Sequence, residues 1–162
     1  TNDERSLIRV DADELTYPLH VILRYEIEKD LIEGKAEAND IPAMWDEKMM
    51  AYLDLDTRGN YQDGCLQDVH WPAQLFGYFP TYTLGAMMAA QFFNAMIKSL
   101  PDLAEEIRTG RLERAVGWLR QNVHGKGSLL VTNDLMASAT GEPLNARYFL
   151  NHLKARYLVD VA

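Results

Sequence analysis

The first strong pattern of apolar and polar positions predicts an amphipathic helix that ends near Glu33. Apolar residues recur through this stretch close to every 3.6 positions, which is the period of an α-helix. These residues are Leu15, Leu19, Ile22, Leu23, Ile27 and Leu31. Asp13 or Thr16 is expected to cap the start of this helix, and Gly34 is expected to end it.

Six further segments have a helical pattern, and no segment shows the alternation of a β-strand. Their expected bounds are 40–53, 80–99, 103–108, 111–123, 135–139 and 145–158. The stretch from Leu84 to Ile97 is apolar on nearly every face, which suits a buried helix at the centre of a bundle. It is too short to span a bilayer. We therefore predict an all-α fold of about seven helices, with a single domain over residues 1–162.

The composition is that of a globular protein and narrows the possible functions. The 162 residues include 24 acidic and 16 basic side chains, which gives a formal net charge of −8. A chain this acidic is not expected to bind nucleic acid nonspecifically. Cys65 is the only cysteine, so no disulfide can form within the chain. This fits a reducing compartment, and we predict a cytoplasmic location.

Side chains that can carry chemistry gather in a turn-rich stretch between residues 63 and 82. The stretch holds two acids, two amides, a histidine, an indole and two phenols, and glycines and prolines interrupt it. We expect a loop here, because Gly and Pro break regular elements. Functional side chains are often carried on loops held by rigid elements. From composition alone, a structural loop whose aromatic side chains close the core is the better interpretation.

Three motifs carry a resemblance to a known family. Gly64 to Trp71 reads G-x-x-Q-D-x-H-W, and Phe76 to Tyr82 reads F-G-Y-F-P-T-Y. The third motif, I-R-x-x-A-D, lies at Ile8 to Asp13. In their order along the chain, with I-R-x-x-A-D first, these motifs resemble those of the thermostable carboxypeptidase Taq family of zinc metallocarboxypeptidases, and the resemblance continues through Tyr157. Gln74 stands where that family usually has a glycine, so the local turn is expected to differ.

The resemblance also indicates what this chain lacks. The family holds its zinc with an H-E-x-x-H helix and a downstream glutamate, and none of the four histidines here is followed by Glu-x-x-His. Family members are much longer, and this chain resembles roughly their C-terminal third. The resemblance therefore implies zinc, or another divalent metal, in the intact enzyme and no metal in this chain.

By this resemblance His70, Tyr78 and Tyr82 are the candidate catalytic residues. His70 would form a hydrogen bond to the substrate or the transition state. The alternative is a core histidine whose hydrogen bond goes to a carbonyl group. Phenols are good oxyanion donors because they are neutral at pH 7. Tyr78 and Tyr82 would share a face if their segment were helical. The alternative is a pair of core aromatic residues whose hydroxyls reach water.

Arg9, Gln67 and Asp68 are the candidate substrate-binding residues. A guanidinium can grip a carboxylate with two parallel hydrogen bonds, and the resemblance implies this role for Arg9 at the chain end of a peptide. From the residues alone, Arg9 would lie at the surface or pair with a neighbouring aspartate. Gln67 could bind the substrate backbone or close the loop. Asp68 could orient His70 or form a cap, although their i, i+2 spacing does not favour direct pairing.

We therefore predict the C-terminal domain of a metallocarboxypeptidase that releases C-terminal amino acids from peptides. The implied partners are peptides with a free C-terminus, the N-terminal part of the same enzyme, and a second copy in a homodimer. No nucleic acid and no membrane is expected as a partner. The isolated chain is predicted to be inactive, because it lacks the zinc ligands. The alternative is a noncatalytic helical protein-interaction domain that kept the fold and lost the chemistry.

Overall fold

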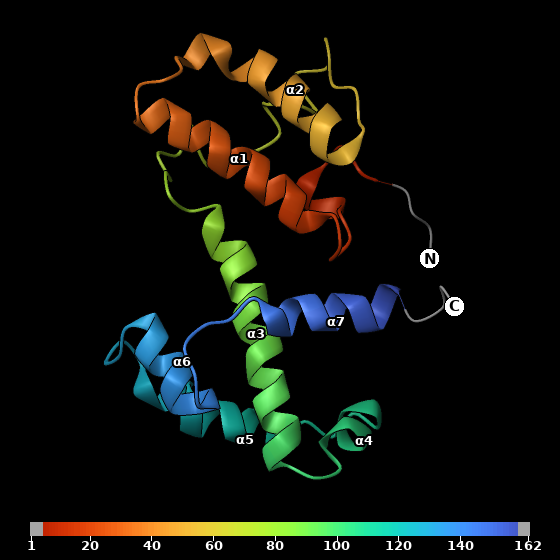
Figure 1. Cartoon of the computed structure of the whole chain (residues 1–162), viewed down its shortest axis with the longest axis vertical. Helices are drawn as coiled ribbons and strands as arrows, with labels where there is room; N and C mark the ends of the chain where they lie inside the picture. The colour runs from red at the N-terminus through yellow and green to blue at the C-terminus, as the bar shows by residue number, and fades with distance from the viewer. Residues whose placement is uncertain (1–4, 159–162) are drawn as a thin grey trace. The chain divides into compact units, whose positions relative to one another are not determined.

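Seven α-helices form the regular structure of the chain, whose computed structural model describes residues 5–158 (Figure 1). The helices are α1 (Tyr17–Ile32), α2 (Ile41–Leu53), α3 (Pro80–Ser99), α4 (Leu103–Arg108), α5 (Glu113–Asn122), α6 (Thr132–Thr140) and α7 (Arg147–Tyr157). Three short 3₁₀ turns are η1 (Arg9–Asp11), η2 (Ala38–Asp40) and η3 (His124–Lys126). No residue in 5–158 is in a β-strand. The predicted all-α fold of about seven helices is therefore confirmed.

Most helices lie close to the bounds expected from the sequence. The largest difference is at α6, which begins at Thr132 rather than at Leu135. At the start of α1, the Asp13 carboxylate accepts hydrogen bonds from the backbone N–H groups of Leu15 (3.1 Å) and Thr16 (2.7 Å). The three 3₁₀ turns were not predicted, because a single turn leaves no periodic pattern in a sequence.

Contacts within the chain divide it into two compact units, and the division falls after Thr83, inside α3. The first unit contains α1, α2 and the long loop that follows α2. The second contains most of α3 together with α4 to α7. The single domain over residues 1–162 stays a prediction.

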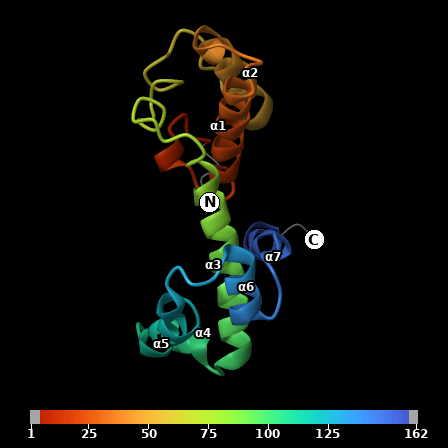
Figure 2. The same cartoon turned by 90° about the vertical axis from the view of Figure 1, so that its left-hand side faces the viewer.

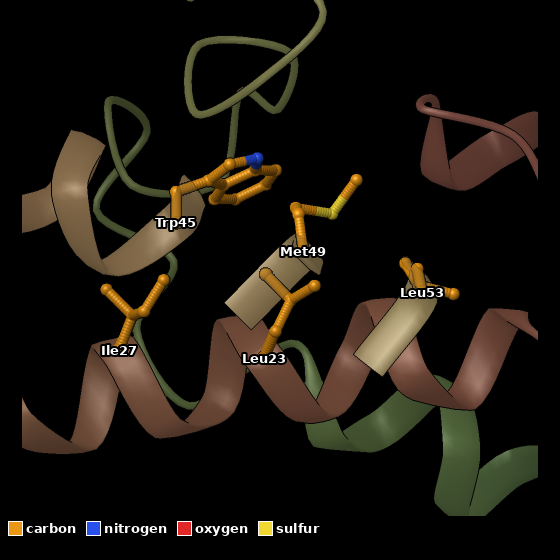
Figure 3. Packing of buried hydrophobic residues seen from close by; sticks show 5 residues of the cluster. All are labelled: Leu23, Ile27, Trp45, Met49 and Leu53. Carbon is orange, nitrogen blue, oxygen red and sulfur yellow. The ribbon is translucent and has the colours of Figure 1, made fainter. Parts of the chain in front are cut away.

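The first unit is built on the packing of α1 against α2, which lie side by side in both views (Figures 1 and 2). Leu23 and Ile27 are one helical turn apart on α1 and are fully buried. They face three residues spaced by four on α2, as Figure 3 shows: Trp45, Met49 and Leu53. Each of these side chains contributes roughly 1.5–3 kcal/mol by leaving water. This core gives the loop a rigid base.

The loop at residues 54–79 is irregular but firmly held. The hydroxyl of Thr57 donates to Asp46 on α2 at 2.5 Å. Gly64, the first residue of G-x-x-Q-D-x-H-W, passes so close to Asn60 that a Cβ would lie 2.6 Å from the Asn60 carbonyl oxygen. Phe79 is fully buried at the end of the loop. The glycine of the motif is therefore required by the tight path of the backbone.

In the second unit, α3 packs through one face against the other helices. Phe92 and Met96 of α3 form an apolar cluster with Leu103 of α4 and Met136 of α6. Gln91 is buried beside them, and its side-chain oxygen accepts a hydrogen bond from the backbone N–H of Asn145 at 2.9 Å. This amide joins α3 to the connection between α6 and α7.

The expectation that α3 is buried on nearly every face is wrong for this structure. Leu84, Phe93 and Ile97 are about two-fifths exposed, at 43%, 45% and 38%. The apolar cluster of the second unit covers only the face that carries Phe92 and Met96. Within residues 5–158, no helix has both the length and the apolar character needed to cross a membrane.

The turn at Gln74 generates a stability prediction. The N–H of Gln74 donates to the Trp71 carbonyl and the N–H of Leu75 donates to the His70 carbonyl, and Gln74 has φ = 60°. This pattern is the Schellman ending of a helical turn, whose left-handed position favours glycine. We expect Gln74→Gly to stabilise the chain by about 0.5–1 kcal/mol in urea unfolding.

The matched control is Gln74→Val, because a β-branched residue tolerates positive φ worse than glutamine does. This variant should be less stable than the wild type. If the glycine and valine variants unfold at the same urea concentration, the left-handed turn at Gln74 is not present in solution.

Candidate functional site

One carboxylate lies at the centre of the polar cluster in the first unit. Oδ1 of Asp68 accepts hydrogen bonds from Nε (3.1 Å) and Nη2 (2.8 Å) of Arg9. Oδ2 of Asp68 accepts from Nε of Arg24 at 2.5 Å. The side chains of Arg9, Arg24 and Asp68 are 8%, 0% and 9% exposed. Asp68 therefore pairs with two buried guanidinium groups that come from η1 and α1.

The pKa of Asp68 reflects these two partners. Burial by itself would raise the pKa of this carboxyl group, because a low dielectric disfavours the charged form. The charges and hydrogen bonds of Arg24 and Arg9 outweigh that effect and hold the pKa of Asp68 below its usual range. The carboxylate is therefore charged at neutral pH.

Gln67 joins the same segments through all of its side-chain atoms that can form hydrogen bonds. Its Oε1 accepts from the backbone N–H of Arg9 and from Nη2 of Arg24, both at 2.8 Å. Its Nε2 donates to the carbonyl oxygens of Leu7 (3.0 Å) and Asp63 (2.6 Å). The structure thus places Gln67 as a clamp between the N-terminal segment, α1 and the loop. Its binding of substrate stays a prediction.

Three polar side chains in one row along α1 support the polar cluster around Asp68. His20, Arg24 and Glu28 are spaced by four, so they share one face of the helix, and all three are buried. The guanidinium of Arg24 donates to the His20 carbonyl at 2.8 Å and lies 4.4 Å from the centre of the Trp45 ring. The sequence analysis did not assign any of the three to the site. Their spacing, beside the apolar stripe of α1, was the available signal.

Glu28 bonds to two positions in the second half of the loop. One carboxylate oxygen accepts from Nε1 of Trp71 at 3.0 Å, and the other accepts from the backbone N–H of Gly77. The residues between Trp71 and Gly77 are thereby closed into a turn against α1. This contact fixes where the chain enters the F-G-Y-F-P-T-Y motif, and hence where Tyr78 lies.

His70 lies between Asp68 and Tyr82 and is 6% exposed. Its Nε2 is 2.9 Å from the Tyr82 hydroxyl, and its Nδ1 is 3.5 Å from Oδ1 of Asp68, too far for a regular hydrogen bond. Because a carboxylate only accepts, we assign the hydrogen to Nδ1 and let Tyr82 donate to Nε2. Burial, together with the charges of Arg9 and Arg24, lowers the pKa of His70 despite Asp68. The ring is therefore neutral at pH 7.

The two candidate tyrosines differ in their surroundings. Tyr82 is in the first turn of α3, whereas Tyr78 precedes the helix, so the expected common helical face is not formed. Their rings nevertheless meet edge to face, with centres 5.5 Å apart. The Tyr82 hydroxyl bonds to His70, while Tyr78 is 44% exposed and its hydroxyl bonds to no residue within 5–158. Of the two hydroxyls, only that of Tyr78 is not already engaged.

From its residue type alone, Arg9 was expected to lie at the surface or to pair with a neighbouring aspartate. The structure shows neither arrangement. Arg9 is 6% exposed and pairs with Asp68 across the first unit. Its Nη1 donates to the Tyr17 hydroxyl at 2.6 Å, and its guanidinium carbon lies 5.0 Å from the centre of the Tyr82 ring. These bonds use three of its five N–H groups, which leaves one hydrogen each on Nη1 and Nη2.

All six residues proposed from the sequence therefore lie in the first unit, and five of them are in one connected network. Those five are Arg9, Gln67, Asp68, His70 and Tyr82, with Tyr78 against the rings of His70 and Tyr82. The part of the chain that the structure describes contains no group of three His, Cys, Asp or Glu side chains able to hold a metal ion. The residues of this site therefore do not fit a zinc centre of their own.

Comparison with known proteins identifies relatives over almost the whole chain. The family model for the carboxypeptidase Taq (M32) metallopeptidases matches residues 2–157. Carboxypeptidase 1 of Bacillus subtilis is 43% identical over 152 residues, which are 94% of this chain and 30% of that protein. Thermostable carboxypeptidase 1 of Thermus thermophilus is 43% identical over 154 residues, which are 95% of this chain and 30% of that protein.

Solved structures agree with these matches. Metallocarboxypeptidase 1 of Trypanosoma cruzi superposes with a TM-score of 0.91 at 49% identity, over 96% of this chain and 32% of that one. A carboxypeptidase of Pyrococcus furiosus gives a TM-score of 0.90 at 35% identity, over 95% and 31% of the two chains. The present chain thus spans about 30% of the length of the curated relatives it matches.

His20 generates a prediction about pH. Its Nε2 donates to the Ser6 carbonyl at 3.1 Å, and Nδ1 faces the guanidinium of Arg24. Burial, followed by the charge of Arg24, lowers the pKa of His20 from 6.5 to about 4. Since the unfolded chain binds this proton more tightly, stability should be full above pH 6.5 and fall as the pH drops toward 4. The loss is on the order of 3 kcal/mol.

Urea unfolding of wild type and His20→Gln at several pH values measures this loss. The stability difference between the two chains should shrink between pH 6.5 and 4, because glutamine does not titrate. His124→Gln, an exposed histidine in the second unit, is the matched control and should keep the wild-type pH dependence. A constant difference between wild type and His20→Gln would contradict the buried neutral histidine.

Proposed function

Because the chain belongs to the carboxypeptidase Taq (M32) family of metallopeptidases, we propose that it is the C-terminal part of a zinc-dependent carboxypeptidase. Its residues would bind the free carboxylate of a peptide and stabilise the transition state for cleavage of the last peptide bond. The observation that carries this proposal is the contact between Arg9 and Asp68. It joins two family motifs that are 59 residues apart in the chain into one site.

The metal is proposed to be supplied by the part of the enzyme outside this chain. Its chemistry there would be to polarise the peptide carbonyl and activate water. The sequence contains no H-E-x-x-H motif, and none of the site residues is assigned to the metal. The roles that remain for this chain are substrate binding and stabilisation of negative charge.

Arg9 is proposed to bind the terminal carboxylate of the substrate. Its Nε and one hydrogen of Nη2 are engaged by Asp68, so the guanidinium plane is fixed before a substrate arrives. The remaining hydrogens on Nη1 and Nη2 are the ones available to a carboxylate. A cation held in place by a carboxylate and a clamp residue costs little ordering entropy on binding. Asp68 and Gln67 contribute to binding by holding Arg9 in this position.

Tyr78 is proposed as the hydrogen-bond donor to the oxyanion, because its hydroxyl is not engaged elsewhere. Tyr82 and His70 form the neighbouring pair, in which Nε2 of His70 accepts the Tyr82 hydroxyl hydrogen and holds that hydroxyl beside Tyr78, where the pair is proposed to contribute to stabilising the transition state. Neutral donors suit this role, since they stabilise a developing negative charge without a competing ion pair. The edge-to-face contact between the two tyrosine rings keeps both hydroxyls in one region.

Several predictions from the sequence and its family resemblance remain proposals. They are peptide substrates with a free C-terminus, association with the N-terminal part of the same enzyme, a homodimer, and a cytoplasmic location. The exposed apolar residues on α3 are consistent with a face that another segment covers.

The isolated chain should neither hold zinc nor hydrolyse peptides. After dialysis against trace zinc, mass spectrometry should find less than about a tenth of an equivalent of metal per chain. Release of amino acids from N-acylated dipeptides should not increase with the amount of chain added. One tightly bound zinc per chain, or hydrolysis proportional to this chain in a preparation free of peptidases, would contradict the division of roles proposed here.

A chimaera tests the residue roles directly. This chain would replace the matched portion of carboxypeptidase 1 of Bacillus subtilis, which is 43% identical to it. The chimaera should release C-terminal residues from N-acylated peptides, and Tyr78→Phe should lower kcat by roughly 10²–10³-fold, the loss typical of one oxyanion donor.

Tyr25→Phe is the matched control, since Tyr25 and Tyr78 are equally exposed at 45% and 44%. The control variant should retain full activity. A folded, zinc-containing chimaera that is inactive would refute the proposed function, and full activity of Tyr78→Phe would refute the role of Tyr78 alone.

A further inference from the structure

Tyr17 is a half-buried phenol whose hydroxyl is only partly satisfied. It accepts a hydrogen bond from Nη1 of Arg9 at 2.6 Å. A hydroxyl has one hydrogen to donate and two lone pairs with which to accept. No residue within 5–158 accepts the hydrogen of Tyr17, so this donor is available beside a buried cation.

The position of Tyr17 is fixed from both sides by the I-R-x-x-A-D motif. Its backbone N–H donates to the Asp13 carbonyl at 2.8 Å, at the point where α1 begins. Its hydroxyl contacts Arg9, the second residue of the same motif. Its ring meets the ring of Tyr82 edge to face, with centres 6.3 Å apart. Tyr17 therefore lies between the start of α1 and the candidate catalytic residues.

The hydrogen-bond donors that Arg9 and Tyr17 have left are suited to binding an anion. Among residues 5–158, Asp68 is the only carboxylate that pairs with Arg9, and it contacts the Nε and Nη2 side of the guanidinium. The second hydrogen on Nη1 and the hydroxyl hydrogen of Tyr17 are both donors, and their heavy atoms are 2.6 Å apart. Two adjacent donors, one of them charged, match the two oxygens of a carboxylate.

We propose that Tyr17 is a substrate-binding residue that holds the terminal carboxylate of the peptide together with Arg9. This inference rests on the proposed function and adds a second ligand for the carboxylate. The Arg9 bond makes the Tyr17 hydroxyl a stronger donor, because hydrogen bonds in a chain polarise one another. Tyr17 thereby favours a free chain end over an amidated one, which has no charge to share between the two donors.

The test is an NMR titration of the 162-residue chain carrying ¹³C-labelled tyrosine rings. The probe is N-acetyl-L-leucine, which has a free carboxylate, and the control ligand is N-acetyl-L-leucinamide. We expect the acid to bind more tightly than the amide and to shift the Tyr17 ring signal. Tyr17→Phe should weaken binding of the acid roughly tenfold, the effect of losing one hydrogen bond to a charged group. Tyr25→Phe, on the same helix, should bind as the wild type does.

The outcomes separate this inference from the proposed function. If Tyr17→Phe binds the acid as tightly as the wild type while Arg9→Lys binds it weakly, Arg9 keeps its role and the inference for Tyr17 is overturned. If the wild type binds the acid no better than the amide, the carboxylate grip of the proposed function is itself overturned. The wild-type spectra give an independent check, because a Tyr17 signal that the acid leaves unchanged also overturns the inference.

Discussion

The Asp68 carboxylate is the interaction on which the first unit depends. It pairs with Arg9 from the N-terminal segment and with Arg24 from α1, and it belongs to the loop itself. Three segments that are distant in sequence are thus joined by one side chain. Removing one partner from a buried ion pair leaves an uncompensated charge, at a cost of about 3–5 kcal/mol. The apolar core between α1 and α2 supplies the rigid base. Asp68 then fixes the N-terminal segment and the loop against α1.

The same contacts that hold the fold also prepare the candidate site. Asp68 fixes the plane of the Arg9 guanidinium and lies 3.5 Å from Nδ1 of His70, so a cation and a neutral histidine lie beside one carboxylate. Glu28 closes the loop that presents Tyr78. Preorganised donors are effective because they need not reorient as charge develops. We infer that the buried charged and polar side chains of this unit serve the proposed site as well as the stability of the fold.

The sequence predicted the helices well because their apolar residues repeat at 3.6 positions, as at Leu23 and Ile27. It predicted the site residues only through the family motifs, since nothing local places Arg9 against Asp68. Arg24 and Glu28 were missed because polar residues on an amphipathic helix normally face water. Tyr17 was missed because its role depends on Arg9. The left-handed turn at Gln74 leaves no signal in the residue itself, and the family's usual glycine at that position was the available signal. The structure keeps the glycine-like conformation there, so the expectation that the turn would differ was wrong.

The measurement that tests the central claim most directly is the free energy of urea unfolding of Asp68→Asn beside that of Asp56→Asn. Both aspartates pair with an arginine, but Asp56 and Arg58 lie at the surface, where ion pairs contribute little. We predict that Asp68→Asn loses about 3–5 kcal/mol and that Asp56→Asn remains close to the wild type. Equal stability of the two variants would mean that no single carboxylate organises this unit, and would contradict the account.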